Sequence, residues 1–306
     1  MTSQPTRSPL TRRDFLKTAG AGAAAATVTC LIGDVKPAFA SGGSSENASG
    51  VLIDVTRCNG CQSCALACKE ANGRSDPTVE PVKLSSDAYS FVDERGVPNT
   101  VEPAYVKRQC MQCLEPACAS ACTVGAMRKT PEGPVVYDAK KCIGCRYCQY
   151  ACPFGVPTYD WQNPLGLIHK CQFCVSRLAE GQKPACVEGC PAGALRFGKR
   201  SELLVQARAQ IDTNPGRYID HIYGEHEVGG TSMLYLSGVP FAQLGLPTLG
   251  DQPAPRYAEA VMKKTPIVAV SVASLATGLY WLMKRRDLNL AKAEIQVPDQ
   301  EDRHDH

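Results

Sequence analysis

The fold is decided by the stretch Cys142-Ile143-Gly144-Cys145-Arg146-Tyr147-Cys148-Gln149-Tyr150-Ala151-Cys152-Pro153. Its cysteines follow the spacing Cys-x2-Cys-x2-Cys-x3-Cys, and the same spacing occurs once more upstream. Two further runs of four cysteines have longer internal gaps. Of the 17 cysteines in the chain, all but Cys30 belong to these four runs, which are Cys58, Cys61, Cys64 and Cys68 (run one), Cys110, Cys113, Cys118 and Cys122 (run two), Cys142, Cys145, Cys148 and Cys152 (run three), and Cys171, Cys174, Cys186 and Cys190 (run four).

The spacing of runs one and three is that of bacterial ferredoxins, in which three cysteines hold one [4Fe–4S] cluster and the fourth holds its neighbour. A Cys-x2-Cys-x2-Cys loop presents three thiolates to three corners of a cube. The x3 gap is an i, i+4 step on a short helix, which directs the fourth thiolate towards a different cluster. The runs therefore predict four [4Fe–4S] clusters, with all sixteen cysteines as iron ligands, and one-electron transfer.

Two other uses of cysteine compete with this interpretation. Structural zinc sites also use Cys-x2-Cys pairs, but they need two pairs rather than four cysteines in one run. A disulfide framework is common in exported chains, yet disulfides have no reason to repeat one spacing four times. Both alternatives are disfavoured by the repeated pattern.

The N-terminus carries an export signal. Thr11-Arg12-Arg13-Asp14-Phe15-Leu16-Lys17 is a twin-arginine motif, and a weakly apolar stretch and Ala38-Phe39-Ala40 follow it. Residues 1–40 are therefore expected to be a signal peptide, with Ser41 as the first mature residue. Cys30 lies inside this signal and is expected in no cluster. Export of a folded, loaded protein would allow the clusters to be built in the reducing cytoplasm first.

A second membrane feature lies near the C-terminus. Ile267 to Met283 is uncharged and mostly apolar, and lysines and arginines flank it. A helix of this length spans roughly 26 Å, slightly less than the hydrocarbon core. We expect a linker over 246–265, a transmembrane anchor over 266–283 and a disordered cytoplasmic tail over 284–306, in agreement with the positive-inside rule.

Composition and motifs exclude other functions. The net charge of +3 is close to balanced, and nothing in the sequence predicts binding to nucleic acid. There is no glycine-rich phosphate loop, and neither the five histidines nor the acidic residues form a catalytic pattern. The chain is expected to transfer electrons without a catalytic site of its own.

Residues 41–245 form an internal repeat that predicts an α+β fold. A short strand-like segment precedes each run, and the Met127 to Tyr137 stretch is typical of a hairpin. The longer gap from Lys69 to Gln109 predicts an inserted ribbon. The gap inside run four, Val175 to Ala185, predicts a surface loop.

Three stretches carry a resemblance to a known family. They are Gly144-Cys145-Arg146-Tyr147-Cys148 with Ala151-Cys152-Pro153-Phe154 and Val156-Pro157; His169-Lys170-Cys171; and Ile222-Tyr223-Gly224-Glu225 through Gly229-Gly230-Thr231 to Leu236-Ser237-Gly238-Val239-Pro240. With them the mature chain resembles the four-cluster electron-transfer subunits of bacterial respiratory oxidoreductases, and within that group the hydrogenase-2-type iron–sulfur subunit.

The resemblance implies two interleaved, bacterial-ferredoxin-like dicluster lobes, with runs one and four in one lobe and runs two and three in the other. The spacing alone leaves neighbour pairing, one with two and three with four, as an alternative. The ligand sets that the resemblance implies are Cys58, Cys61, Cys64 and Cys190; Cys171, Cys174, Cys186 and Cys68; Cys110, Cys113, Cys118 and Cys152; and Cys142, Cys145, Cys148 and Cys122.

The resemblance also implies the partners. Electrons would pass from the large and small subunits of a nickel–iron hydrogenase, through this chain, to a multi-span quinone-reactive subunit in the bacterial inner membrane. The cluster domain would lie on the periplasmic side. Two alternatives stay open: the same kind of subunit serving formate dehydrogenase or another molybdopterin enzyme, and a structural zinc-binding membrane anchor.

Overall fold

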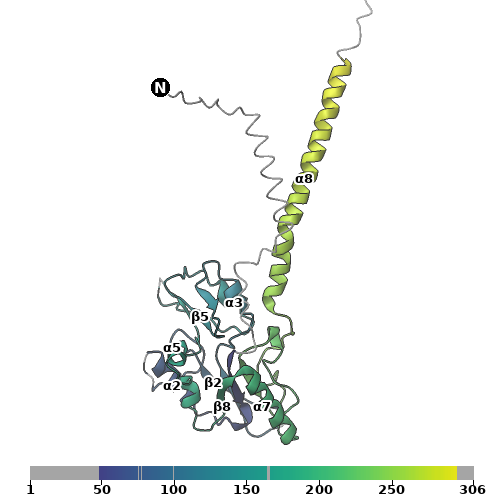
Figure 1. The fold of residues 1–306 in the computed structure, drawn as a ribbon. Coiled ribbons are helices and arrows are strands. Elements are labelled where there is room, and N and C mark those ends of the chain that lie inside the picture. Colours follow the sequence, from purple (N-terminus) through teal and green to yellow (C-terminus); the bar gives the residue numbers. More distant parts are fainter. Residues whose placement is uncertain (1–47, 75, 77, 99, 164–165, 295–306) are drawn as a thin grey trace, which may run out of the picture. The chain divides into compact units, whose positions relative to one another are not determined.

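The computed structural model describes residues 48–74, 76, 78–98, 100–163 and 166–294 (Figure 1). The signal segment and residues 295–306 therefore lie outside the described part. Helices and strands are both short and alternate along the chain, apart from one long helix near the C-terminus. This mixture agrees with the α+β class expected from the sequence.

The central sheet joins the two ends of the cysteine-rich region. Strand β1 (Ser49–Asp54) pairs antiparallel with β8 (Leu195–Lys199) and parallel with β9 (Met233–Leu236). Side chains alternate along β1. Leu52 packs with Leu203 and Ala207 of helix α7 (Arg200–Thr213), whereas Val51 and Ile53 face the opposite side and line a cavity that four cysteines share. The sheet thus separates a helix-covered face from a cysteine-lined face.

Three two-stranded hairpins make up the other strands among the described residues. The strands of each hairpin run antiparallel. One of them, between Met127 and Tyr137, confirms the hairpin expected there from the sequence. The pairs are β2 (Phe91–Arg95) with β3 (Ala104–Arg108), β4 (Met127–Lys129) with β5 (Val135–Tyr137), and β6 (Thr158–Tyr159) with β7 (Ile168–His169).

Short helices carry or precede the last cysteines of every run. In each run the third cysteine lies inside the helix, and the fourth lies in it or follows it by one or two residues. This is the helical step that the x3 spacing predicts. The helices are α2 (Ser63–Ala71), α3 (Ala117–Ser120), α4 (Tyr147–Ala151) and α6 (Ala185–Glu188).

The expected surface loop over Val175 to Ala185 is in part a helix. Helix α5 (Val175–Ala179) follows Cys174 directly, and the Leu178 amide donates to the Cys174 carbonyl over 3.0 Å. The Arg177 guanidinium closes the segment, because it bonds the Lys183 carbonyl at 3.1 Å and the Glu188 carboxylate at 2.5 Å. Sequence length alone could not show these side-chain bridges.

The Gly-Gly-Thr segment ties run two to the central sheet. It begins at the last residue of the short 3-10 helix η3 (Glu227–Gly229), and Gly230, which caps this helix, has a φ of 92°. The Leu114 amide donates to the Gly230 carbonyl at 3.0 Å, and the Ser232 amide donates to the Gln112 carbonyl at 3.1 Å. This positive φ explains why a glycine stands here, and a Cβ would in addition lie 2.9 Å from the Arg200 guanidinium.

Helix α8 (Ala254–Glu294) is longer than the anchor predicted from the sequence. Its stretch Lys264–Leu290 is long and apolar enough to cross a membrane, with a mean hydropathy of 1.6. The helix begins within the expected linker and continues into the tail expected to be disordered. Cation–π contacts one turn apart, Lys284 over Tyr280 and Arg285 over Trp281, support this continuation.

Candidate metal centres

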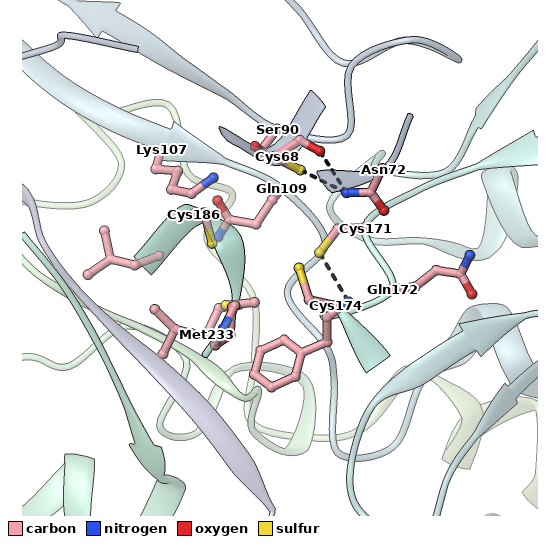
Figure 2. Close-up of a pocket in the computed structure, with 14 residues that line it drawn as sticks. Cys68, Asn72, Ser90, Lys107, Gln109, Cys171, Gln172, Cys174, Cys186 and Met233 are labelled. Carbon is pink, nitrogen blue, oxygen red and sulfur yellow. Dashed lines mark hydrogen bonds between the residues drawn. The ribbon is translucent and has the colours of Figure 1, made fainter. Parts of the chain in front are cut away.

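The sixteen described cysteines are free thiols, and three cavities each gather four of them. The cavity in Figure 2 also holds Lys107 and Phe173, and its four cysteines come from runs one and four. A second cavity shares Lys107 with the first. We name these sets group I, Cys58, Cys61, Cys64 and Cys190, and group II, Cys68, Cys171, Cys174 and Cys186.

Two further sets combine runs two and three. Burial raises the pKa of Cys113 well above its usual range, and the thiolates of Cys110, Cys118 and Cys152 raise it further. A cavity beside Tyr137 and Arg146 collects the remaining four cysteines. We name these sets group III, Cys110, Cys113, Cys118 and Cys152, and group IV, Cys122, Cys142, Cys145 and Cys148.

Neighbouring thiols connect each group to the next. Group I adjoins group II, because the pKa of Cys64 is raised by burial and, in part, by the thiolate of Cys68. Group II adjoins group III in the same way, through Cys171 and Cys110. Group III adjoins group IV: burial and neighbouring thiolates, including that of Cys148, raise the pKa of Cys118 to about 12. These neighbouring thiols link the groups in the sequence I to II, II to III and III to IV.

The loops share one backbone conformation. The residue before the second cysteine has a positive φ in every run: 77° at Gly60, 52° at Gln112, 70° at Gly144 and 60° at Phe173. In runs one, three and four this turn aims the amide of that residue at the first cysteine of the run. The Gly144 and Phe173 amides donate to the sulfurs of Cys142 and Cys171 at 3.4 and 3.3 Å. Such bonds favour the thiolate, the form that binds a metal.

A second turn closes runs two, three and four. Three residues after the last cysteine stands a glycine with φ between 60° and 64°, and its amide donates to the carbonyl of that cysteine. Run one differs, because helix α2 continues past Cys68 to Ala71, so that Lys69 is helical where the other runs begin to turn. The glycines of these turns are Gly125, Gly155 and Gly193.

Cationic side chains accompany the groups. The Lys107 side chain lines both the group I and the group II cavities and is 3% exposed. Burial alone would lower the pKa of Lys107, but the thiolates of Cys64, Cys186, Cys68 and Cys171 raise it above its ordinary value. The Lys170 ammonium donates to the carbonyls of Val135 and Cys171. Arg146, beside group IV, stacks on the rings of Tyr159 and Trp161.

Several polar side chains beside the cysteine groups were not predicted from the sequence. The Asn72 amide donates to the Cys68 sulfur over 3.6 Å, as Figure 2 shows, and Gln112 lies with its amide nitrogen 4.0 Å from the Cys171 sulfur. Lys107 belongs with them. The position of a lysine in a strand shortly before a cysteine run is the one signal that the sequence offers for it.

The donor sets fit iron–sulfur clusters. Groups I, II and IV each place four thiols around a cavity, and in groups II and IV amide N–H donors are directed at the sulfurs. Group II also has an unpartnered donor, because the buried Ser90 hydroxyl that lines its cavity has no hydrogen-bond partner. Within residues 48–294 as far as they are described, no three His, Cys, Asp or Glu side chains are placed to share a single metal ion.

Comparison with known proteins decides the family. The model of the 4Fe-4S dicluster domain matches residues 101–200. The hydrogenase-2 operon protein HybA of Escherichia coli O157:H7 is 39% identical over 282 residues, which are 79% of this chain and 85% of that protein. The chain belongs to the family of hydrogenase-2-type iron–sulfur electron-transfer subunits. A protein of Nitratidesulfovibrio vulgaris is 42% identical over 301 residues, 94% of this chain and 81% of its own length.

More distant members of the same group serve other enzymes. The formate dehydrogenase iron-sulfur subunit of Haemophilus influenzae is 35% identical over 198 residues, 60% of this chain and 63% of that subunit. Membership makes this chain an electron-transfer subunit of a respiratory oxidoreductase, without a catalytic site of its own. The twin-arginine signal model matches residues 9–29, which confirms the export signal expected there and implies export across the membrane.

Proposed function

We propose that this chain is the electron-transfer subunit of a membrane-bound nickel–iron hydrogenase complex, and that its sixteen run cysteines hold four [4Fe–4S] clusters. Each cluster supplies a site that takes up and releases one electron. Groups I to IV would each hold one of them. The chain would conduct electrons from the hydrogenase small subunit, which receives them from the large subunit, towards a multi-span quinone-reactive subunit.

The grouping of the cysteines carries this proposal. Every group takes three cysteines from one run and the fourth from another: runs one and four exchange Cys68 and Cys190, and runs two and three exchange Cys122 and Cys152. This agrees with the ligand sets that the family resemblance implies. The exchange also supports two interleaved dicluster lobes, because neither lobe can complete its ligand sets from one run.

The accessibility of the groups supports a relay with two ends. Cys61 of group I and Cys145 of group IV are exposed, whereas every cysteine of groups II and III is buried or half-buried. A line of sites that is closed in the middle and open at both ends suits a protein that receives electrons from one partner and delivers them to another. Group I and group IV are therefore the proposed contact points.

The membrane arrangement rests on both ends of the chain. The twin-arginine signal supports a periplasmic cluster domain, and the apolar stretch of α8 supports an anchor in the inner membrane. Lys284, Arg285 and Arg286 would then lie on the cytoplasmic side, in agreement with the positive-inside rule. An anchored domain would keep its delivery site close to a quinone-reactive partner.

A molybdopterin enzyme is the second candidate partner. The similarity to formate dehydrogenase iron-sulfur subunits favours it, but that match covers 60% of this chain, against 79% for the hydrogenase-2 relative. The hydrogenase assignment therefore accounts for more of the sequence.

Purification from native membranes in mild detergent tests the partner. We expect a tag on this chain to bring down a nickel-containing enzyme and a multi-span membrane protein, and hydrogen gas to reduce the bound clusters. A molybdopterin-containing partner in the same preparation, without nickel, would refute the hydrogenase assignment and establish the second candidate.

A further inference from the structure

We propose that Lys107 sets the reduction potentials of the clusters in groups I and II together, as one buried cation shared by two redox sites. This inference rests on the proposed function, because it requires clusters at both groups. It adds a role for a residue that is not a ligand and that no cysteine pattern marks.

The position of Lys107 follows from strand alternation. Tyr105 and Lys107 lie two residues apart on β3 and therefore project from the same face. The Tyr105 ring covers Gly60 in the first cysteine loop, where a Cβ would lie 2.5 Å from the ring. Lys107 projects beside it, and its side chain lines the cavities of both groups. Figure 2 shows the lysine nitrogen directed into the group II cavity, towards the side of Cys68 and Cys186.

The backbone at Lys107 is fixed on its other side. The Tyr235 hydroxyl donates to the Lys107 carbonyl at 2.7 Å, and the Gln109 amide donates to the same hydroxyl at 2.8 Å. Tyr235 belongs to β9 and is 1% exposed, so this bridge joins β3 to the central sheet. The bridge holds the strand in place and determines which side chains of β3 face the two cavities.

The other buried or half-buried lysines near the groups are placed differently. Lys170 and Lys129 direct their ammonium groups to backbone carbonyls, Lys170 to Val135 and Cys171, and Lys129 to Cys113 at 2.7 Å. Lys69 donates to the Val79 carbonyl at 3.1 Å and pairs with Asp87 at 3.3 Å. Lys107 is the one that lines two cysteine cavities at once among those described.

The direction of the effect follows from electrostatics. Reduction adds a negative charge to a cluster, and a cation in a weakly screened interior favours that state. One ammonium group that borders two clusters raises both potentials. Removing the charge should therefore lower the potentials of both groups, whereas a change in ligation would alter one of them.

The test is a redox titration of Lys107→Met in the intact complex, followed by electron paramagnetic resonance. Signals are first assigned to groups with the single variants Cys61→Ser and Cys68→Ser. We expect the ratio of oxidised to reduced cluster at a fixed potential to rise at least tenfold in groups I and II, which is about 59 mV for one electron. Groups III and IV should keep their potentials.

Three control variants make the result decisive. Lys107→Arg retains the charge and should leave both potentials near those of the unmodified protein. Lys199→Met removes a lysine whose side chain is 61% exposed and should shift no cluster. Lys107→Gln is a second neutral variant, in case the methionine variant folds poorly, and should shift the potentials like Lys107→Met.

Two outcomes would overturn the inference. In the first, a neutral variant retains its iron and the potentials of groups I and II do not change. In the second, both neutral variants lose the iron of these groups, which would make Lys107 a structural residue. Failure of the proposed function looks different, because the unmodified protein itself would then lack the signals of four clusters.

Discussion

Cys68 and Cys186 line one cavity, although Cys68 belongs to the first cysteine run and Cys186 to the last. Cys68 lies near the end of α2 and Cys186 lies in α6, so the cavity joins two short helices from opposite ends of the cysteine-rich region. A metal cluster bound there would fasten the beginning of the mature chain to its later part. Group II thus links folding to cofactor binding.

Exchange of the fourth cysteine predicts which cluster each variant damages. We expect Cys68→Ser to disturb the cluster of group II, although Cys68 follows three group I cysteines in the sequence. Cys61→Ser should disturb group I. Iron analysis and electron paramagnetic resonance of both variants check this, and loss of the same signal from both would contradict the exchange.

Gly60 and Gly144 form a matched pair for the loop conformation. Both have a positive φ, so alanine at either position costs roughly 1–2 kcal/mol of backbone strain. A Cβ at Gly60 would also lie 2.5 Å from the Tyr105 ring, whereas at Gly144 the nearest atom is 3.5 Å away. We expect Gly60→Ala to lose a further 1–3 kcal/mol, roughly the cost of overpacking. Thermal unfolding of the two variants tests this difference, and equal losses would contradict it.

Gln112 connects three parts of the cluster region. Its side-chain oxygen accepts from the Val135 amide at 2.7 Å, and its amide nitrogen donates to the Cys171 carbonyl at 3.0 Å. Gln112→Ala would leave the Val135 amide without this partner and the Cys171 carbonyl with Lys170 alone as donor, and we expect a loss of about 1–3 kcal/mol in the free energy of unfolding. Gln206→Ala, at an exposed position of α7, is the control and should change stability by less than about 0.5 kcal/mol. Similar values for the two variants would contradict the role of Gln112.

Removal of the anchor tests the role of α8. A chain that ends after Arg256 keeps the bond from the Val228 amide to the Gly250 carbonyl and the packing of Pro253 on Gly229. In cells without the membrane partner, we expect this variant in the soluble periplasmic fraction with its iron intact, and the full chain in the membrane fraction. Recovery of both chains in the same fraction would show that α8 does not anchor the protein.

The cysteine pattern predicted the elements that position the candidate ligands. Thiolates that share a cube require fixed spacings, so the short helices after the loops could be foreseen from the i, i+4 step. The hairpin around Met127 and Tyr137 was predicted from turn residues between two short strand-like segments. These features depend on neighbours along the chain.

Features that depend on distant contacts could not be predicted in this way. Glycine marks the left-handed turn at Gly60 and Gly144, but Gln112 and Phe173 adopt the same conformation with no such mark. Lys107 is buried where β3 pairs with β2 and is bonded to Tyr235. The alternation of side chains along a strand would, taken alone, predict that a lysine faces solvent. The continuation of α8 past Met283 contains side-chain contacts one turn apart, such as Lys284 over Tyr280, that the charged composition of the tail does not reveal.

Iron and acid-labile sulfide analysis of the purified chain tests the central claim most directly. Four [4Fe–4S] clusters predict about sixteen irons and about sixteen sulfides per chain, since each cluster holds four of each. Fewer than about twelve irons per chain, or zinc in their place, would contradict the four-cluster account.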